Sequence, residues 1–377
     1  MKNRLAGACL ALFATLSGSA LAETGVFPDR IVIGQTITMQ NGANAHGMAV
    51  VDGVRSAFEE VNRKGGVYGR RIEVKLLDDE NRSDQAAENA RKLIEEERVF
   101  LVFGSIEGGP SSAVMGVTTE AGVPFFGPMG GTPTLREPHQ PLVFPVRADH
   151  TAEFRTILEY ARSIGLTRAA FLRADSGGGE LHLANVQRIV AELGMELVAD
   201  LPFQSGLDEE GVAAIAAKIG ESRAQVVFNH GVGIFERVIR AARAQEIDAY
   251  FFGINSGSFP IAQSLGDMAR GMVFAQVVPS PWQRKNAITR SYQETFSAYK
   301  PDEPFSYSSM EGYLTARALV EALRLAGPEL TRESFLSALR NADLKVEDMT
   351  ISYRPGRHVG MDWLDISVVT ANGEFRH

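Results

Sequence analysis

The chain has 377 residues, 45% of them hydrophobic and 22% charged, and 38 lysine and arginine against 46 aspartate and glutamate residues give a formal net charge of −8. This is the composition of a folded globular protein and excludes a disordered or fibrous one. At roughly 150 residues per domain, the length predicts two lobes. The acidic balance offers no basic surface to a phosphate backbone, so nucleic acid is not expected as a partner.

The first 22 residues have the parts of a cleavable secretory signal peptide. Lys2 and Arg4 precede an almost entirely apolar run, Leu5–Leu16, and Ala20-Leu21-Ala22 fits a cleavage site of small residues. The run is shorter than the roughly 20 apolar residues that a membrane span needs. We therefore expect export to the periplasm and a mature chain that begins at Glu23.

From residue 31 onward, strand-like and helix-like stretches alternate, which is typical of parallel α/β construction. Strands are expected at 31–33, 72–76, 100–103, 123–126, 169–172, 197–201, 226–228 and 250–252, and a strand-like tail at 349–369. Helices are expected at 46–64, from Ser83, from Pro110, through 154–161, and at 181–193, 213–219, 235–244, 289–299, 308–326 and 332–341.

Glycine is common just after the predicted strands, where open parallel sheets bind their ligands. Five loops have this character, at residues 104–110, 127–133, 175–180, 229–233 and 255–258. The first two end in proline, which we expect at the first position of a helix. Such a turn leaves backbone N–H groups free for an anionic ligand group, assisted by the helix dipole. The alternative, that the glycines only permit tight turns, stays open for any single loop.

No cofactor, metal or catalytic motif occurs in these loops. The sequence has no GxxxxGK[ST] motif, and Gly231-Val232-Gly233 lacks the third glycine of a dinucleotide fingerprint. The seven histidines show no HExxH spacing, and the one cysteine, Cys9, would leave with the signal peptide. Ser105 and Ser176 lack the GxSxG context of a hydrolase. We expect no cofactor, no metal and no catalytic residues.

Several short motifs occur in a characteristic order between Ile31 and about Gly373. They are Ile33-Gly34-Gln35, the turn of residues 61–70, Leu77-Asp78-Asp79, the Gly104 loop, residues 121–124, Gly131-Thr132-Pro133, residues 144–147 and Gly271-Met272. In this order the chain resembles the type I periplasmic solute-binding proteins of ABC importers, specifically the leucine/isoleucine/valine-binding family. The resemblance implies an α/β fold of two Rossmann-like lobes with parallel sheets joined by three crossovers.

The resemblance also implies lobe boundaries and partners. We expect residues 23–147 with 278–345 in lobe 1 and residues 148–277 with 346–377 in lobe 2, with crossovers near 146–149, 276–279 and 344–349. Such lobes close over a small-molecule solute by hinge motion. The second implied partner is a membrane permease, and the protein is expected to act as a monomer.

Carried over residue by residue, the family's ligand contacts fall on residues of different type here. The serine and threonine that hold a ligand carboxylate fall at Gly108 and Gly131, and the acidic residue that meets the ammonium falls at Asn255. Cleft tyrosines fall near His46, Gly178 and Gly231. With the neighbouring loop positions, the expected ligand-binding set is His46, Glu107, Gly108, Gly109, Met129, Gly130, Gly131, Thr132, Asp175, Gly178, His230, Gly231 and Asn255.

These replacements affect the expected solute. Backbone amides at Gly108 and Gly131 could still bind a carboxylate. Asn255 carries no charge to offset a buried ammonium, whose desolvation costs several kcal/mol when unpaired. An aliphatic amino acid would then need Glu107, Asp175 or Glu180 as its counter-charge. A bulkier carboxylate or an amide is the other expectation, because loss of aromatic side chains enlarges the cavity.

The function expected from the sequence is a non-enzymatic carrier. It would capture an amino acid or a related carboxylate or amide and deliver it to a permease. Two alternatives stay open: a ligand-sensing module on the same fold, and a secreted α/β enzyme in which Glu107 and Asp175 act as acid and base across the cleft.

Overall fold

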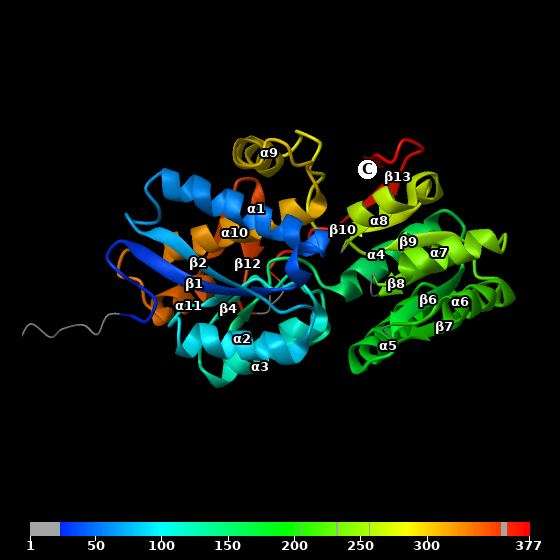
Figure 1. Ribbon diagram of the computed structural model, residues 1–377, viewed down its shortest axis with the longest axis horizontal. Helices are drawn as coiled ribbons and strands as arrows, with labels where there is room; N and C mark the ends of the chain where they lie inside the picture. Colours follow the sequence, from blue (N-terminus) through cyan, green and yellow to red (C-terminus); the bar gives the residue numbers. More distant parts are fainter. Residues whose placement is uncertain (1–22, 205, 231–232, 256, 356–359) are drawn as a thin grey trace, which may run out of the picture.

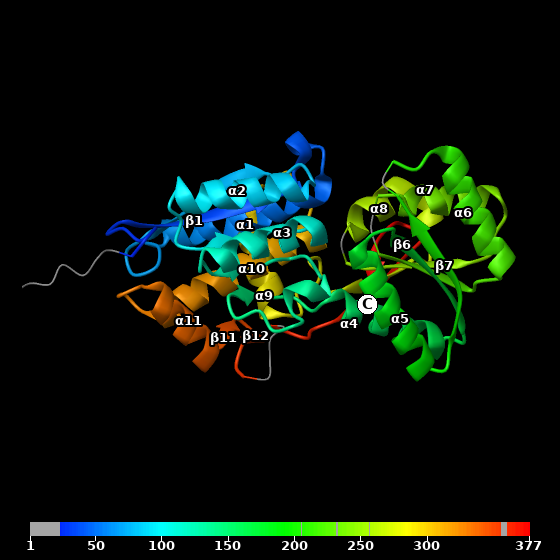
Figure 2. The same ribbon diagram turned by 90° about the horizontal axis from the view of Figure 1, so that it is seen from below.

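The computed structural model describes residues 23–204, 206–230, 233–255, 257–355 and 360–377. The expected signal peptide lies outside these residues, as does Gly231. Two α/β halves lie side by side, each built around its own sheet, and both views separate them clearly (Figures 1 and 2). None of the helices in the described part of the chain combines the length and hydrophobicity needed to cross a membrane.

The first half contains a five-stranded parallel sheet in the order β2-β1-β3-β4-β5. Its strands are β1 (Arg30–Ile37), β2 (Arg71–Asp78), β3 (Val102–Phe103), β4 (Phe125–Phe126) and β5 (Val143–Phe144). Helices α1 (Ala45–Arg63) and α10 (Tyr307–Ala326) cover one face, and α2 (Ser83–Glu95) and α3 (Gly108–Glu120) cover the other (Figure 1). α9 (Ala287–Tyr299) and α11 (Arg332–Asn341) complete this half.

Helical periodicity explains how these helices bind the sheet. Val50, Val54 and Val61 on α1 are spaced to share one face, and all are buried in the core under β1. On the opposite face, Ala86, Ala90 and Leu93 of α2 pack into a separate buried cluster with α3. A parallel sheet covered on both faces needs strands that are apolar on both sides, as the fully buried β3 and β4 are.

The second half contains a seven-stranded sheet in the order β14-β13-β10-β9-β8-β6-β7. Its strands are β6 (Arg168–Ala174), β7 (Glu196–Phe203), β8 (Val226–His230), β9 (Tyr250–Gly253), β10 (Val273–Gln276), β13 (Asp365–Val369) and β14 (Phe375–Arg376). Its helices are α4 (His150–Ser163), α5 (Gly177–Glu192), α6 (Glu209–Ser222), α7 (Phe235–Ala244) and α8 (Ser258–Leu265). The strands β6 to β9 are parallel as expected, and β10, which the sequence did not predict, continues the parallel sheet. The C-terminal β13 and β14 add to its edge in antiparallel orientation.

The chain passes between the halves after β5, after β10 and before β13. Between the second and third passages, β11 (Asp343–Val346) and β12 (Met349–Ser352) form an antiparallel hairpin beside α10. A lobe boundary at residues 345/346 would cut this hairpin in two. We therefore propose that the first half extends to Ser352 and that the third crossover lies between β12 and β13.

The two proline-ended loops differ from the expectation. α3 begins at Gly108, two residues before Pro110, after an extended N-cap at Glu107. Proline is accepted there because the first-turn N–H groups have no helical partner. Pro133 begins only a three-residue 3-10 turn, Pro133–Leu135. A turn of this length has no appreciable dipole, so the dipole argument holds for the first loop and not for the second.

Candidate ligand-binding site

The loop after β4 in the first half lies directly against the start of α4 in the second half. The backbone N–H of His150 donates to the carbonyl oxygen of Gly131 at 2.8 Å. A Cβ atom at Gly131 would lie 2.4 Å from Nδ1 of His150. Glycine is therefore required at residue 131 for the imidazole to occupy its place.

The N terminus of α3 adjoins the same loop. A Cβ atom at Gly108 would lie 3.5 Å from Cβ of Thr132, and one at Gly130 would lie 3.4 Å from the carbonyl oxygen of Glu107. The N–H groups of Gly108 and Gly109 belong to the first helical turn and lack intrahelical acceptors. Gly109 is exposed and faces Ser83. The two glycine loops of the first half thus form one surface with unused backbone donors.

Glu107, the N-cap residue of α3, precedes these glycines in the chain, and its side chain makes no capping hydrogen bond. Burial, with a smaller contribution from the charge of Asp79, raises the pKa of Glu107 to about 7. Asp79 is itself fully buried and accepts hydrogen bonds from Thr38 Oγ1 (2.6 Å) and from the backbone N–H of Asn81 (3.0 Å). Glu107 is therefore close to its midpoint at neutral pH and can either donate a proton to an anionic group or pair with a cationic one.

Two buried arginines fix the loop that follows β4. Arg147 donates to the carbonyl oxygen of Met129 (3.3 Å), and Arg136 donates to those of Gly130 (3.3 Å) and Thr132 (3.2 Å). Arg136 also donates to the carbonyl oxygen of Arg147 at 3.0 Å. The carbonyl groups of this loop are thereby occupied, which leaves its position determined independently of any solute.

Arg147 is also the centre of a buried ion-pair network. It is 1% exposed, donates to Oε2 of Glu153, and has its Nη1 atom 3.7 Å from Oε1 of Glu311. Glu153 lies on α4 in the second half and Glu311 on α10 in the first. Asn255, which follows β9, donates from its backbone to Glu153 and from its side chain to Glu311, both at 2.8 Å. The network therefore joins the two halves.

Three histidine rings gather on the second-half side of this network. The ring centroids of His182 and His230 are 3.9 Å apart, and each is 5.4 Å from that of His150. His150 Nδ1 lies 2.8 Å from Glu153 Oε2. Burial lowers the pKa of all three, that of His230 to about 4. They are neutral at pH 7, and within the described ranges no set of three or more candidate ligands has the geometry to hold a metal ion.

His46 lies on the first half beside a crevice, the cavity between the two halves that is described below. It is the second residue of α1, and its Nδ1 lies 2.8 Å from Ser308 Oγ at the start of α10. Burial and the charge of Arg147 lower the pKa of His46 to about 4. A cavity of about 560 Å³ adjoins this contact. It is lined from both halves, by Ala45, Ala49 and Asp52 of α1, Phe259, Pro260, Gln263 and Ser264 of α8, and Phe296, Glu303, Pro304, Ser306, Ser308 and Ser309.

The structure does not bring every expected residue to this cluster. Asp175 is exposed and interacts with Gln204, which follows the edge strand β7. It therefore lies toward the outer edge of its sheet. Gly178 is partly buried in the first turn of α5, and the nearest atom to a Cβ there would be Ser176 Oγ, at 3.9 Å. Gly231 lies outside the described residues.

Sequence reasoning missed Arg147, His150, Glu153, His182 and Glu311 as part of the candidate site. A usable signal was present for two of them. Glu153 and Glu311 are charged residues among apolar neighbours on amphipathic helices, where an unpaired carboxylate would be costly. Such a residue needs a buried partner, and the partner of both is Arg147.

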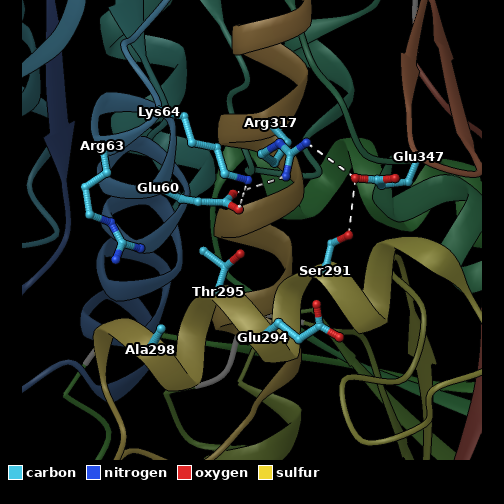
Figure 3. Close-up of a pocket in the computed structure, with 9 residues that line it drawn as sticks. All are labelled: Glu60, Arg63, Lys64, Ser291, Glu294, Thr295, Ala298, Arg317 and Glu347. Carbon is cyan, nitrogen blue, oxygen red and sulfur yellow. Dashed lines mark hydrogen bonds and ion pairs between the residues drawn. The ribbon is translucent and has the colours of Figure 1, made fainter.

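A second hollow, of about 480 Å³, lies elsewhere on the first half (Figure 3). Arg317 of α10 pairs there with Glu60 of α1 (3.5 Å) and with Glu347 in the β11–β12 turn (3.4 Å). Glu60 also pairs with Lys64 at 2.7 Å. These residues lie roughly 20 Å along α1 from His46, given a rise of 1.5 Å per residue. Glu60, Lys64, Arg317 and Glu347 pair with one another. This hollow is separate from the crevice near His46.

The fold has two α/β halves joined by three chain crossovers, with a glycine-lined loop surface on the first half and His150, His182, His230 and Asn255 on the second. The family model described as periplasmic binding protein matches residues 30–372. The chain therefore belongs to the periplasmic binding protein family. Members of this family are solute-binding proteins and not enzymes, and they act outside the cytoplasm. The alternative of an enzyme that uses Glu107 and Asp175 is accordingly not supported.

Individual relatives are distant. "Leu/Ile/Val-binding protein homolog 7" of Brucella abortus is 43% identical over 74 residues, which cover 20% of this chain and 18% of that protein. "Leucine-, isoleucine-, valine-, threonine-, and alanine-binding protein" of Pseudomonas aeruginosa is 22% identical over 347 residues, 87% of each chain. The match to the first of these relatives thus spans less than a fifth of its length.

Solved structures show the same fold over nearly the whole chain. A possible leucine/isoleucine/valine-binding protein from Rhodopirellula baltica gives a TM-score of 0.85 at 21% identity, over 93% of this chain and 96% of that one. A solute-binding protein of an ABC transporter from R. palustris, in complex with benzoate, gives a TM-score of 0.79 at 18% identity, over 91% and 94%.

Proposed function

We propose that this protein is the periplasmic solute-binding component of an ABC importer, and that it captures a small polar carboxylate between its two lobes for delivery to a membrane permease. One observation carries the proposal. Gly108, in the first turn of α3 where the backbone N–H groups lack intrahelical acceptors, lies beside Thr132, on a surface whose adjoining Gly131 contacts His150 of the opposite lobe. A carboxylate at this point would be met by backbone donors at a helix N terminus.

The charge states of the residues at the proposed site limit the kinds of solute that it can bind. The pKa of Glu107 is raised to about 7, so this residue can be neutral at pH 7. Asn255 carries no charge, and His46 and His230, whose pKa values are lowered to about 4, are uncharged at pH 7. Such a site suits a solute with one carboxylate and neutral polar groups better than one with several charges. The names of similar proteins support two chemical classes, the branched-chain amino acids and the aromatic carboxylates.

Thermal unfolding with and without solute tests the proposal. Purified protein is screened against amino acids, hydroxy acids, aliphatic and aromatic carboxylates, and amides, and hits are measured by calorimetry. A ligand present at 100 times its Kd should stabilise the fold by about 2.7 kcal/mol. Gly108→Val should abolish this stabilisation, because a branched side chain would cover the donors, while the solute-free protein unfolds nearly as before. Normal binding by this variant would contradict the anion site.

Delivery to a permease is tested in cells. Uptake of the radiolabelled solute should require the gene for this protein and should fall to background in a Gly108→Val strain. Uptake that persists in the deletion strain, combined with a signalling defect, would favour the sensing alternative.

A further inference from the structure

The side-chain amide of Asn255 has one satisfied end and one unsatisfied end. Its Nδ2 donates to Glu311 Oε2 at 2.8 Å, whereas its Oδ1 has no hydrogen-bond partner among the described residues. The side chain is 1% exposed. A buried acceptor without a donor costs about 1–3 kcal/mol, so its persistence calls for an explanation.

The contact with Glu311 determines which end of the Asn255 side-chain amide has no hydrogen-bond partner. Above its raised pKa of about 7, Glu311 is ionised and can only accept hydrogen bonds, so it faces the NH₂ group of Asn255. The backbone N–H of Asn255 is held as well, by Oε1 of Glu153 at 2.8 Å. With both contacts in place the amide cannot turn, and its carbonyl oxygen stays available to a third group.

Other buried polar atoms on the same side of the crevice also lack partners. They are Nδ1 of His230 and both ring nitrogens of His182, which is fully buried. His230 ends β8 and Asn255 follows β9, and these strands are neighbours in the sheet. Unpartnered polar atoms of His230 and Asn255 thus lie at the ends of two neighbouring strands of the second half.

We propose that Glu311 is a positioning residue that holds the Asn255 amide with its carbonyl oxygen toward the solute, so that the site selects carboxylates that also carry an N–H or O–H donor. This inference rests on the proposed function, because it treats Asn255 as a solute contact. The ligand class is a small carboxylate with an amino, amide or hydroxyl group. A solute that offers only apolar atoms would leave the carbonyl oxygen unpaired.

Glu311→Gln tests the positioning role. Glutamine has nearly the same shape as glutamate, and in this variant Arg147 keeps its ion pair with Glu153. The NH₂ group of the introduced glutamine can donate to Asn255 Oδ1. The Asn255 amide would then turn and offer the solute a hydrogen-bond donor in place of an acceptor. A merely structural change would weaken all solutes alike, whereas loss of positioning changes their ratio.

The probes are pairs that differ by one donor. They are 2-hydroxy-4-methylpentanoate against 4-methylpentanoate, and 4-hydroxybenzoate against benzoate, with Kd measured by calorimetry at pH 8. The wild type should prefer the hydroxylated member of the pair that it binds, and Glu311→Gln should reduce that preference about tenfold. Glu294→Gln, the same substitution at an exposed site on α9 that pairs with Arg284, is the control and should leave the ratio unchanged.

Unchanged ratios in Glu311→Gln, or equal losses for both members, would overturn the inference and leave the proposed function standing. A wild type that binds no carboxylate in the screen would contradict the proposed function itself, and the inference with it. If Glu311→Gln does not fold, Asn255→Ala replaces it. That variant should abolish the preference because it removes the acceptor, and a preference that survives would overturn the inference.

Discussion

The imidazole of His150 occupies the space that a side chain at Gly131 would need. A Cβ atom there would lie within 2.4–2.7 Å of three ring atoms, closer than any packing tolerates. The contact couples the strand-end loop of one lobe to the first turn of a helix in the other. Through His150, the loop is also coupled to Glu153.

The first prediction concerns this contact. Gly131→Ala should lower the free energy of unfolding by about 1–3 kcal/mol, as expected for overpacking at a site that must rearrange. Gly108→Ala is the matched control, since its Cβ would meet Cβ and Cγ2 of Thr132 at ordinary distances of 3.5 and 3.8 Å. It should change stability little. Urea unfolding of both variants without solute makes the comparison, and equal effects would show that His150 can move away freely.

The second prediction concerns the buried ion pair. Glu153→Gln removes one of the two carboxylates that compensate Arg147, and should destabilise the protein by about 3 kcal/mol or more, because the arginine stays buried with less counter-charge. Glu192→Gln, which breaks exposed pairs with Arg155 and Arg188, should have a far smaller effect. Similar unfolding midpoints for the two variants would contradict a structural role for the network.

The order of the elements was predictable because each depends on local sequence. The helix at 332–341 and the one at 235–244 have the bounds that periodicity gives them. α8 was not predicted, since its eight residues are too few to show a clear period. The strand predicted at 100–103 is regular only over Val102–Phe103, although the backbones of Phe100 and Leu101 still hydrogen-bond to β1. Strand length depends on neighbouring strands, which the local pattern does not contain.

The candidate site was only partly predictable. Gly108, Gly130, Gly131 and Thr132 could be found because glycine-rich loops after parallel strands mark a common edge. The pairing of Arg147 with Glu311 could not, because these residues are far apart in sequence and meet only in the folded chain. Asp175 is the converse case, a residue that the sequence suggests and that the structure places away from the other candidate residues. Its loop has the right composition, but the carboxylate lies toward the edge strand β7.

The third prediction concerns acid sensitivity. Burial lowers the pKa of His182, so the folded protein keeps this ring neutral while the unfolded chain takes up a proton near pH 6.5. The unfolded state then binds more protons, and stability falls as the pH falls, by about 1.4 kcal/mol per pH unit for such a group. His182→Leu removes this loss. Its stability relative to the wild type should therefore be higher at pH 5 than at pH 7, measured by urea unfolding; a constant difference would contradict it.

The fourth prediction concerns Glu107 and has the opposite sign. Its pKa in the folded protein is raised to about 7, so between about pH 4.5 and 7 the unfolded chain has lost a proton that the folded chain keeps. The stability contributed by the protonated acid is full below pH 4.5 and is lost as the pH rises through 7. Glu107→Gln is neutral at every pH. Its stability relative to the wild type should therefore rise from pH 5 to pH 8. Urea unfolding at four pH values without solute provides the measurement. A relative stability that falls over this range would mean that the folded protein holds Glu107 as an anion, stabilised by the N terminus of α3 instead of opposed by burial.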